Sequence, residues 1–319
     1  MVRVLRLVQQ GLRYPSIMEA RPPASAYAAA VAMTVAFGLS FVATKYALRG
    51  FEPLLIALLR FALAGAILWC LWRLRPERER AHRAELLRLA ALGFVSLTLY
   101  FALEINGLAR TSASEAAIHI ATIPVFVGAL AGVVLHERLG VRQWGGIALS
   151  FAGIVAMVLL GSGVGGGGLT GNLLVLGAAA AGAVYSLMAR GLLVRRSALY
   201  VTAYQNLFGA LFMAPLALIE ALVVGVEQPT LPSVGALLYL TLGCSVLAYL
   251  LLNYAFRFIA ASRLAVFINL APVVAVTAAY VLLGERLSVG QAAAAIVVVA
   301  GVWWANSGRG EALRSPSAG

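Results

Sequence analysis

Three ionisable residues, Arg60, Glu104 and His119, lie inside long apolar stretches of this 319-residue sequence. In such surroundings a guanidinium and a carboxylate can neutralise each other or bind a charged solute, and an imidazole can exchange a proton near neutral pH. A charge at the centre of a membrane costs about 2.5 to 3.5 kcal/mol, so residues of this kind indicate pairing or function. We expect Arg60 and Glu104 to pair, with His119 in the same network. The alternatives are a purely structural ion pair, or a Glu104 side chain that reaches the membrane surface.

The composition defines the class of protein that holds these residues. Of all residues, 62% are hydrophobic and 11% are charged, and the mean hydropathy is +0.94, whereas a soluble globular protein has about 25% charged residues. The net charge of +12 comes from arginines spread over short connections, a pattern typical of membrane topology and not of a nucleic-acid surface. Cys70 and Cys244 lie in apolar segments and form neither a disulfide framework nor a metal-ligand set. We predict an all-α integral membrane protein in a lipid bilayer, with no metal, no cofactor and no nucleic-acid partner.

Apolar stretches of about 20 residues, the length that spans a bilayer, follow one another along the chain. The sequence predicts ten of them: Ala24–Tyr46, Pro53–Leu71, Leu89–Leu108, Ser112–Leu135, Val141–Leu160, Asn172–Leu192, Leu199–Val223, Val234–Phe256, Ala260–Leu283 and Val289–Asn306. With a helical rise of about 1.5 Å per residue, Glu104 lies about 6 Å below the outer end of its span, and Arg60 and His119 about 10 Å. The three residues therefore occupy a similar level.

Positive residues orient these spans, because short loops rich in arginine and lysine stay in the cytoplasm. With the N-terminus inside, 19 of the 24 positive residues fall on the cytoplasmic side and four on the other, while Arg60 is inside a span. We expect a multi-pass protein of the inner (plasma) membrane with both termini in the cytoplasm.

A duplication is visible at a constant separation of 148 residues. Ala113–Ser114, Pro124–Val125, Glu137–Leu139 and Gln143 recur as Ala261–Ser262, Pro272–Val273, Glu285–Leu287 and Gln291. Each half has five spans, an odd number, so the second half enters the membrane inverted. The sequence predicts a basic cytoplasmic tail (1–23), a first five-helix repeat (24–160), an external glycine-rich linker (161–171), a second, inverted five-helix repeat (172–306) and a cytoplasmic tail (307–319). Gly161, Gly163 and Gly166 match the letters of a dinucleotide motif, but in this linker they lack the strand and helix that such a site needs.

The repeated segments resemble a known family. The run Gly107–Ala113, the Pro124–Phe126 segment and the closing Glu-Arg-Leu triplet of each half are similar to those of EamA-type members of the drug/metabolite transporter superfamily. The resemblance implies ten helices and export of amino acids or other small metabolites, driven by an ion or substrate gradient. One departure is Phe37, where the family often has tryptophan. The basic tail 1–23 is also outside the family pattern, and the sequence leaves open whether translation starts at Met1 or Met18.

Inverted repeats are typical of alternating-access transporters, whose substrate site lies near the midplane between the halves. We therefore expect a secondary active transporter for a small organic solute, without ATP hydrolysis; coupling to protons or to a counter-substrate stays open. Pro124 and Pro272, inside a span of each half, are predicted hinges. Further candidates for substrate binding are neutral polar and aromatic residues at comparable depth: Phe41, Tyr100, Tyr185, Gln205, Asn253 and Asn269.

Two other functions stay open at this point. An intramembrane enzyme would need paired carboxylates, an activated nucleophile or a metal set inside the spans, and the sequence shows none of these patterns. A membrane scaffold that transports nothing would carry the same duplication. The identity of the solute, the direction of transport and the oligomeric state do not follow from the sequence.

Overall fold

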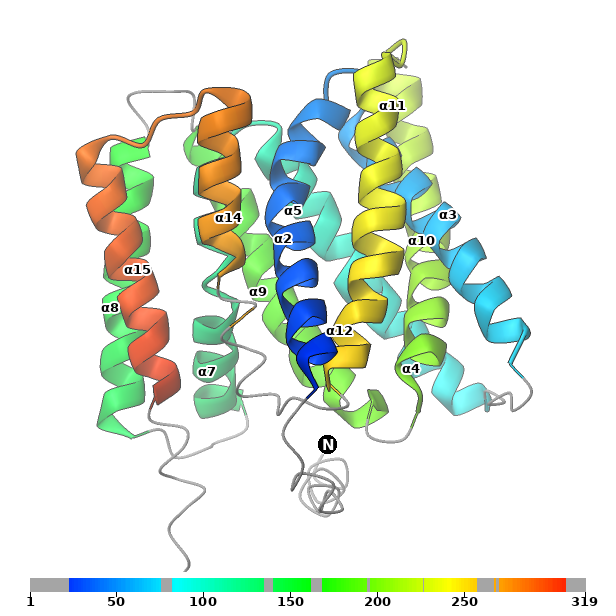
Figure 1. Ribbon diagram of the computed structural model, residues 1–319, viewed down its shortest axis with the longest axis horizontal. Helices are drawn as coiled ribbons and strands as arrows, with labels where there is room; N and C mark the ends of the chain where they lie inside the picture. Colours follow the sequence, from blue (N-terminus) through cyan, green and yellow to red (C-terminus); the bar gives the residue numbers. More distant parts are fainter. Residues whose placement is uncertain are drawn as a thin grey trace, which may run out of the picture.

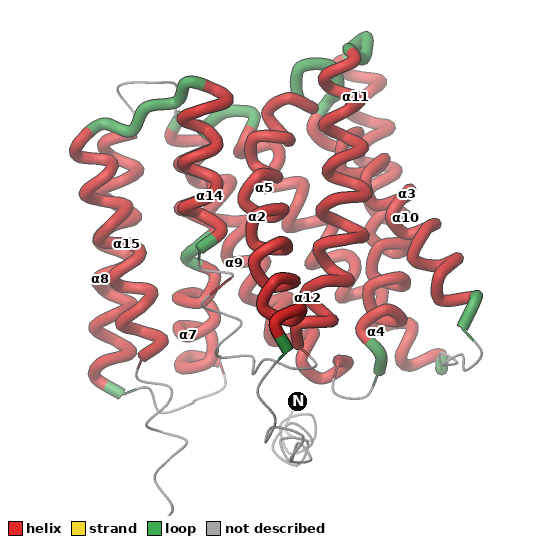
Figure 2. The backbone as a smooth tube through the Cα atoms, in the orientation of Figure 1, coloured by secondary structure: helices red, strands yellow, loops and turns green. Residues whose placement is uncertain are grey.

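The structure, a computed structural model, describes residues 23–75, 82–134, 140–161, 168–193, 196–225, 227–256, 267 and 270–307. All regular elements in these ranges are helices (Figures 1 and 2). The first half contains α2 (Ala24–Ala47), α3 (Pro53–Arg73), α4 (Arg83–Gly93), η1 (Phe94–Leu99), α5 (Tyr100–Leu108), α6 (Ala113–Ile120), α7 (Ile123–Val134) and α8 (Val141–Gly161). The second contains α9 (Leu169–Leu193), α10 (Ala198–Val224), α11 (Leu231–Leu238), η2 (Tyr239–Ala248), α12 (Tyr249–Phe256), α14 (Ala271–Ala278), η3 (Ala279–Leu283) and α15 (Val289–Ser307).

Eight helices of the described residues are long and apolar enough to cross a membrane. They coincide with the first eight predicted spans, while the ninth and tenth correspond to the shorter apolar helices Ala271–Leu283 and Val289–Ala305. Most of the first half of the ninth predicted span lies outside the described residues. The helical fold is as predicted, because a chain in lipid must satisfy its backbone groups internally. The number of ten membrane spans stays a proposal.

Successive candidate membrane spans run in alternating directions, and both ends of the described chain lie at the same end of the bundle (Figure 1). We call the opposite end the far end. The same local contact occurs once at each end: the Gly140 amide donates to Gln143 Oε1 at 2.9 Å, and the Ser288 amide donates to Gln291 Oε1 at 2.8 Å. These pairs are 148 residues apart. Equivalent contacts at opposite ends are what an inverted repeat requires.

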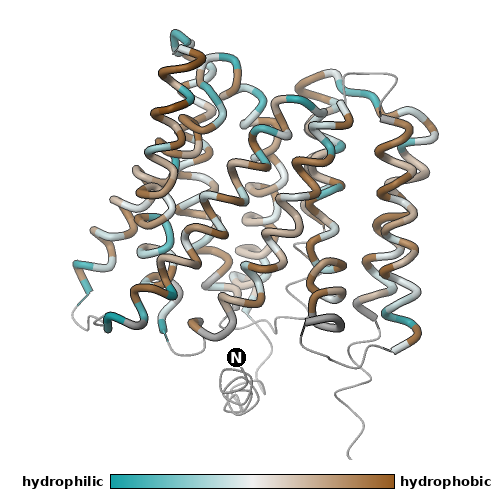
Figure 3. Tube along the Cα trace, turned by 180° about the vertical axis from the view of Figure 1, so that it is seen from behind, coloured by the Kyte–Doolittle hydropathy of each residue, from teal (hydrophilic) through white to brown (hydrophobic). Residues whose placement is uncertain are grey.

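Packing between the halves follows the same symmetry. The second helices of the two halves, α3 and α10, pack against each other, and so do the fifth helices, α8 and α15. Helix α2 packs against η2 and α14 of the second half, and its counterpart α9 packs against α5 and α7 of the first. Apolar residues run along the helices, and polar residues gather at the two ends of the bundle (Figure 3). Polar groups at mid-depth therefore need partners within the protein.

The third helix of each half contains a π-helical stretch, η1 in the first half and η2 in the second. π-Helical turns inside α-helices occur frequently at functional sites. Here η2 carries Ser245, a polar residue at the centre of the bundle that is described below.

The two predicted hinge prolines lie at helix starts and not inside continuous helices. The predicted span Ser112–Leu135 is interrupted at Ala121–Thr122, and Pro124 falls in the first turn of α7. Pro272 likewise lies in the first turn of α14, after a turn at Leu270. A proline in the first turn removes no helical hydrogen bond, because the amides there have no acceptor within the helix. Each proline thus lies beside an interruption of its predicted span, and its role as a hinge stays a prediction.

Helices α8 and α15 approach most closely at glycine. A Cβ atom at Gly146 would overlap the backbone nitrogen of Ala305, whereas a Cβ atom at Gly235 in α11 would meet no atom within 4 Å. We expect Gly146→Ala to lower the thermal stability of the purified protein by about 1 to 3 kcal/mol, the usual cost of overpacking. Gly235→Ala should leave it unchanged or raise it, because alanine favours helix. Equal melting temperatures for the two variants in detergent would contradict this packing.

Candidate functional site

Arg60 lies at the centre of the contact between the halves. Its side chain projects from α3 with 5% exposure, and its Nε donates a hydrogen bond of 2.7 Å to Ser245 Oγ on η2. The guanidinium carbon lies 4.9 Å from the ring centre of Phe101 and 5.4 Å from that of Phe61, within the range of cation–π attraction. A buried cation is thus held by one hydroxyl and two aromatic rings.

Glu104 and Tyr100 lie one turn apart on α5, and the Tyr100 hydroxyl is 3.4 Å from Glu104 Oε1. Glu104 and Arg60 interact electrostatically. However, no ion pair within 4.0 Å joins them in the described part of the chain, where the salt bridge that forms is Arg196–Glu85. The predicted pairing is therefore present as an interaction between nearby charges and not as a direct ion pair.

The second half surrounds these charges with neutral polar groups. Tyr185 on α9 is hydrogen-bonded to Gln205 on α10, and Gln205 Nε2 donates to Ser96 Oγ at 2.7 Å. Tyr249 on α12 interacts electrostatically with charged and tyrosine side chains from both halves. We call this set the central polar cluster; it comprises Arg60, Tyr100, Glu104, Tyr185, Gln205, Ser245 and Tyr249.

Sequence reasoning missed Ser245 and Tyr249, because a neutral serine or tyrosine in an apolar span has no distinctive pattern. Their spacing of four residues, which places both on one helix face, was the available signal. Phe37, at the position where the family often has tryptophan, packs edge-on against Tyr249 with ring centres 5.6 Å apart. This position therefore borders the cluster even though its residue type differs.

Two predicted site residues, Phe41 and His119, lie outside the central polar cluster. Phe41 is buried in an apolar core with Leu108, Ala113 and Ala275. His119 is 1% exposed, and its Nδ1 lies 2.6 Å from the backbone oxygen of Glu115 on the same helix. The contacts of His119 are thus with α6 and not with Arg60 and Glu104, because similar depth does not set the direction in which a helix presents a side chain.

Two predicted residues cannot be placed. Asn253 belongs to α12 but its side chain lies outside the described part, and Asn269 lies outside the described residues. Glu137, in the first copy of the Glu-Arg-Leu segment, also lies outside them.

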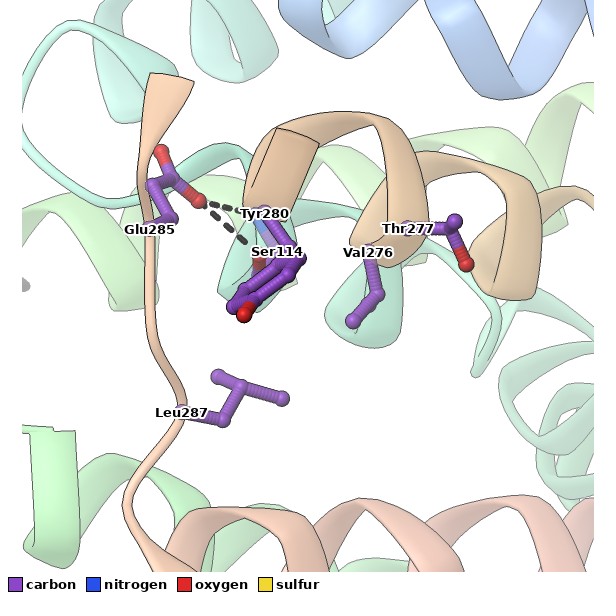
Figure 4. A pocket seen from close by; sticks show the side chains of 6 residues that line it. All are labelled: Ser114, Val276, Thr277, Tyr280, Glu285 and Leu287. Carbon is purple, nitrogen blue, oxygen red and sulfur yellow. Dashed lines mark hydrogen bonds between the residues drawn. The ribbon is translucent and has the colours of Figure 1, made fainter. Parts of the chain in front are cut away.

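A second polar group lies at the far end of the bundle, where the sequence pointed to no site. The Glu285 carboxylate accepts hydrogen bonds from the Ala113 amide at 2.9 Å, the Ser114 amide at 3.0 Å and the Ser114 hydroxyl at 2.9 Å. Glu285 and Ser114 line a cavity of about 320 Å³ with residues of α14 (Figure 4). An acid from the second half thereby caps the N-terminus of a first-half helix, where negative charge is favourable.

An apolar helical bundle that holds charged groups between two related halves is typical of a membrane transporter. Comparison of the sequence with known protein families agrees with this architecture. The chain belongs to the EamA-like transporter family, which matches it twice, at residues 24–159 and 169–307. The resemblance seen in the sequence is confirmed, and the chain is a multi-pass membrane transporter of this family.

Individual relatives carry similar names. An uncharacterized transporter of Archaeoglobus fulgidus is 32% identical over 271 residues, which cover 83% of this chain and 91% of that protein. A probable terminal-alkyne amino-acid exporter of Streptantibioticus cattleyicolor is 29% identical over 258 residues, covering 81% of this chain and 85% of that protein. A crystal structure that is 20% identical has a TM-score of 0.58 and covers 93% of this chain and 100% of its own. This last similarity shows a shared fold.

The hydrogen bond from Arg60 to Ser245 leads to a stability prediction. In Ser245→Ala the buried guanidinium loses its hydroxyl acceptor, and a hydrogen bond to a charged group contributes about 1.5 to 3 kcal/mol. We expect a lower midpoint of thermal unfolding in detergent. Ser186→Ala is the matched control, because that hydroxyl donates to Gly182 within its own helix. A Ser245→Ala midpoint no lower than that of the control would show that Ser245 does not hold Arg60.

Proposed function

We propose that this protein is a secondary active transporter that moves a small organic metabolite, an amino acid or a related compound, across the plasma membrane by alternating access. The observation that carries this proposal is the Arg60 guanidinium, which is buried between the halves and hydrogen-bonded to Ser245. Among the described residues it has no carboxylate within 4.0 Å. A guanidinium in that position is suited to bind a carboxylate, because its planar donors match the two oxygens of the anion.

The charges of the cluster fit a zwitterion. Arg60 would bind the carboxylate of the solute, and Glu104 with the Tyr100 hydroxyl would bind its ammonium group. Tyr185, Gln205, Asn253 and Asn269 are proposed to orient the uncharged part of the solute. The name of the relative from Streptantibioticus cattleyicolor, a probable terminal-alkyne amino-acid exporter, supports this substrate class and outward transport.

The arrangement of the helices supports alternating access. Ten spans in two inverted halves would rock about the central polar cluster, and the helix interruptions before Pro124 and Pro272 are proposed hinges, one in each half. Energy would come from an ion or solute gradient. His119, which the sequence suggested as a coupling residue, lies one turn from Glu115 on α6, and the two residues are tested separately below.

Counterflow in liposomes tests the proposal. Purified protein should exchange radiolabelled amino acids in a way that depends on solute inside the vesicle, and Glu104→Gln and Arg60→Gln should each reduce the rate at least about tenfold. A buried charge left without its counter-charge costs several kcal/mol, and about 1.4 kcal/mol corresponds to a factor of ten. The control is Glu227→Gln, an exposed acid beyond α10.

The amount of each variant in the vesicles is matched by immunoblot. Absence of counterflow for a panel of amino acids and related metabolites would refute the substrate class. Wild-type rates in both cluster variants would leave these residues with a structural role only.

Topology is tested with the equivalent positions Gly140 and Ser288. If both termini are cytoplasmic, Ser288→Cys is labelled in intact cells by a membrane-impermeant thiol reagent, whereas Gly140→Cys is labelled only after permeabilisation. Both variants are made with Cys70 replaced by alanine, because Cys70 is exposed. Labelling of both positions from the same side would contradict the inverted arrangement.

A further inference from the structure

Glu115 is a buried acid that the proposed transport site does not use. It lies in the first turn of α6 with 2% exposure, and its own amide donates to the Ser112 hydroxyl that caps the helix. Its Oε1 accepts a hydrogen bond of 2.6 Å from Gln291 Nε2 of α15. Its Oε2 lies 2.7 Å from Thr111 Oγ, which is in turn 2.5 Å from Asn172 Oδ1 of α9. The acid is therefore held by both halves of the protein.

The protons in this row of oxygens can be counted. The contacts from Glu115 Oε2 to Thr111 Oγ and from Thr111 Oγ to Asn172 Oδ1 each require one proton. The threonine hydroxyl supplies one, and an amide oxygen supplies none. The second proton is available if Glu115 is a neutral carboxylic acid that donates to Thr111, which then donates to Asn172.

The same heavy-atom positions also suit the ionised acid. If the Asn172 amide turns over, its nitrogen donates to Thr111 Oγ and the threonine hydroxyl donates to the carboxylate. Amide oxygen and nitrogen are interchangeable in shape, so this turn moves no other atom. In the orientation present, Asn172 Nδ2 is buried without a hydrogen-bond partner. Thus one proton and one amide rotation separate two states of the same site.

Charged and titratable groups surround Glu115 from several elements. Lys45 of α2 interacts electrostatically with both Glu115 and Glu285. His119 follows one turn later on α6, with its Nε2 buried and unpartnered. Helix α14 contributes small apolar residues, among them Ala275 and Ala278. Lys45 therefore faces two acids when Glu115 is ionised and one when it is protonated.

We infer that Glu115 is a proton-binding site located between the two halves, with Thr111, Asn172 and Gln291 as its hydrogen-bond partners. Because Asn172 and Gln291 belong to the second half, gain or loss of the proton changes contacts that hold the halves together at the far end. Ser114, beside Glu115, is bound by Glu285 of the second half. The site would thereby link a proton gradient to the movement of the halves, a role that rests on the proposed transport function.

Proton binding is tested without any substrate by infrared difference spectroscopy of the purified protein in lipid, from about pH 3.5 to 8.5, a range that begins below the glutamate reference pKa of about 4.3. The wild type should show the carbonyl absorption of a protonated carboxylic acid, and this absorption should decrease as pH rises. Glu115→Gln should lack that component. Glu52→Gln should keep it, because Glu52 is another buried acid at the far end, held by the Glu227 amide.

The Glu115→Asp variant is a control for misfolding, because it retains an acid at this position. It should keep the absorption, with a shifted pH midpoint. Thr111→Val should shift its frequency, because the carboxyl group loses its hydroxyl partner. A titrating absorption that is unchanged in Glu115→Gln, or absent from the wild type, overturns the assignment.

Coupling is tested in liposomes with an imposed pH gradient. Glu115→Gln should retain counterflow of the labelled solute and lose its acceleration by the gradient, whereas His119→Phe should keep both. Loss of the gradient response in His119→Phe but not in Glu115→Gln would assign coupling to the histidine and overturn the inference. Absence of counterflow in the wild type would instead refute the proposed transport function, and the infrared result would be unaffected by it.

Discussion

The Arg60 guanidinium must be solvated by protein groups, because the lipid around the bundle offers neither water nor a counter-ion. The structure meets this requirement across the boundary between the halves, with the Ser245 hydroxyl from the second half and the Phe61 and Phe101 rings from the first. A cation solvated in this way depends on both halves staying in register. Helices α3, α5 and η2 supply the groups that meet this constraint at the centre of the bundle.

Symmetry of the backbone and asymmetry of the charges occur together. Equivalent helices pack as partners, α3 with α10 and α8 with α15, yet Glu104 and His119 have Leu252 and Phe267 at the positions 148 residues on. Arg60 has Gln205 as its counterpart, 145 residues on, where the register of the repeat shifts slightly. The fold itself therefore does not need these charges. Since buried charges are costly, we propose that their presence in one half only reflects what they bind.

The two polar regions suit two different functions. The central polar cluster contains charged groups that lack a direct opposite charge, which suits recognition of a charged solute. The Glu115 region contains closely hydrogen-bonded oxygens that join the two halves, which suits a proton that changes their contact. Glu285 belongs to the second region, because its carboxylate accepts hydrogen bonds from the start of α6, the helix that carries Glu115.

The sequence by itself determined the helices, most of their boundaries and the duplication, because apolar runs of membrane length and a constant repeat register are properties of the linear chain. It also identified Arg60 and Glu104 as neighbours. Only the tertiary structure decided that His119 points away from them, that Tyr249 and Ser245 join them, and that Glu115 is buried. Glu115 lies near the end of its span, where a charge is usually at the surface, and its burial results from α9 and α15 packing over it. Which side chains meet depends on the rotation of each helix and on its neighbours, and these are set by packing between segments far apart in the chain.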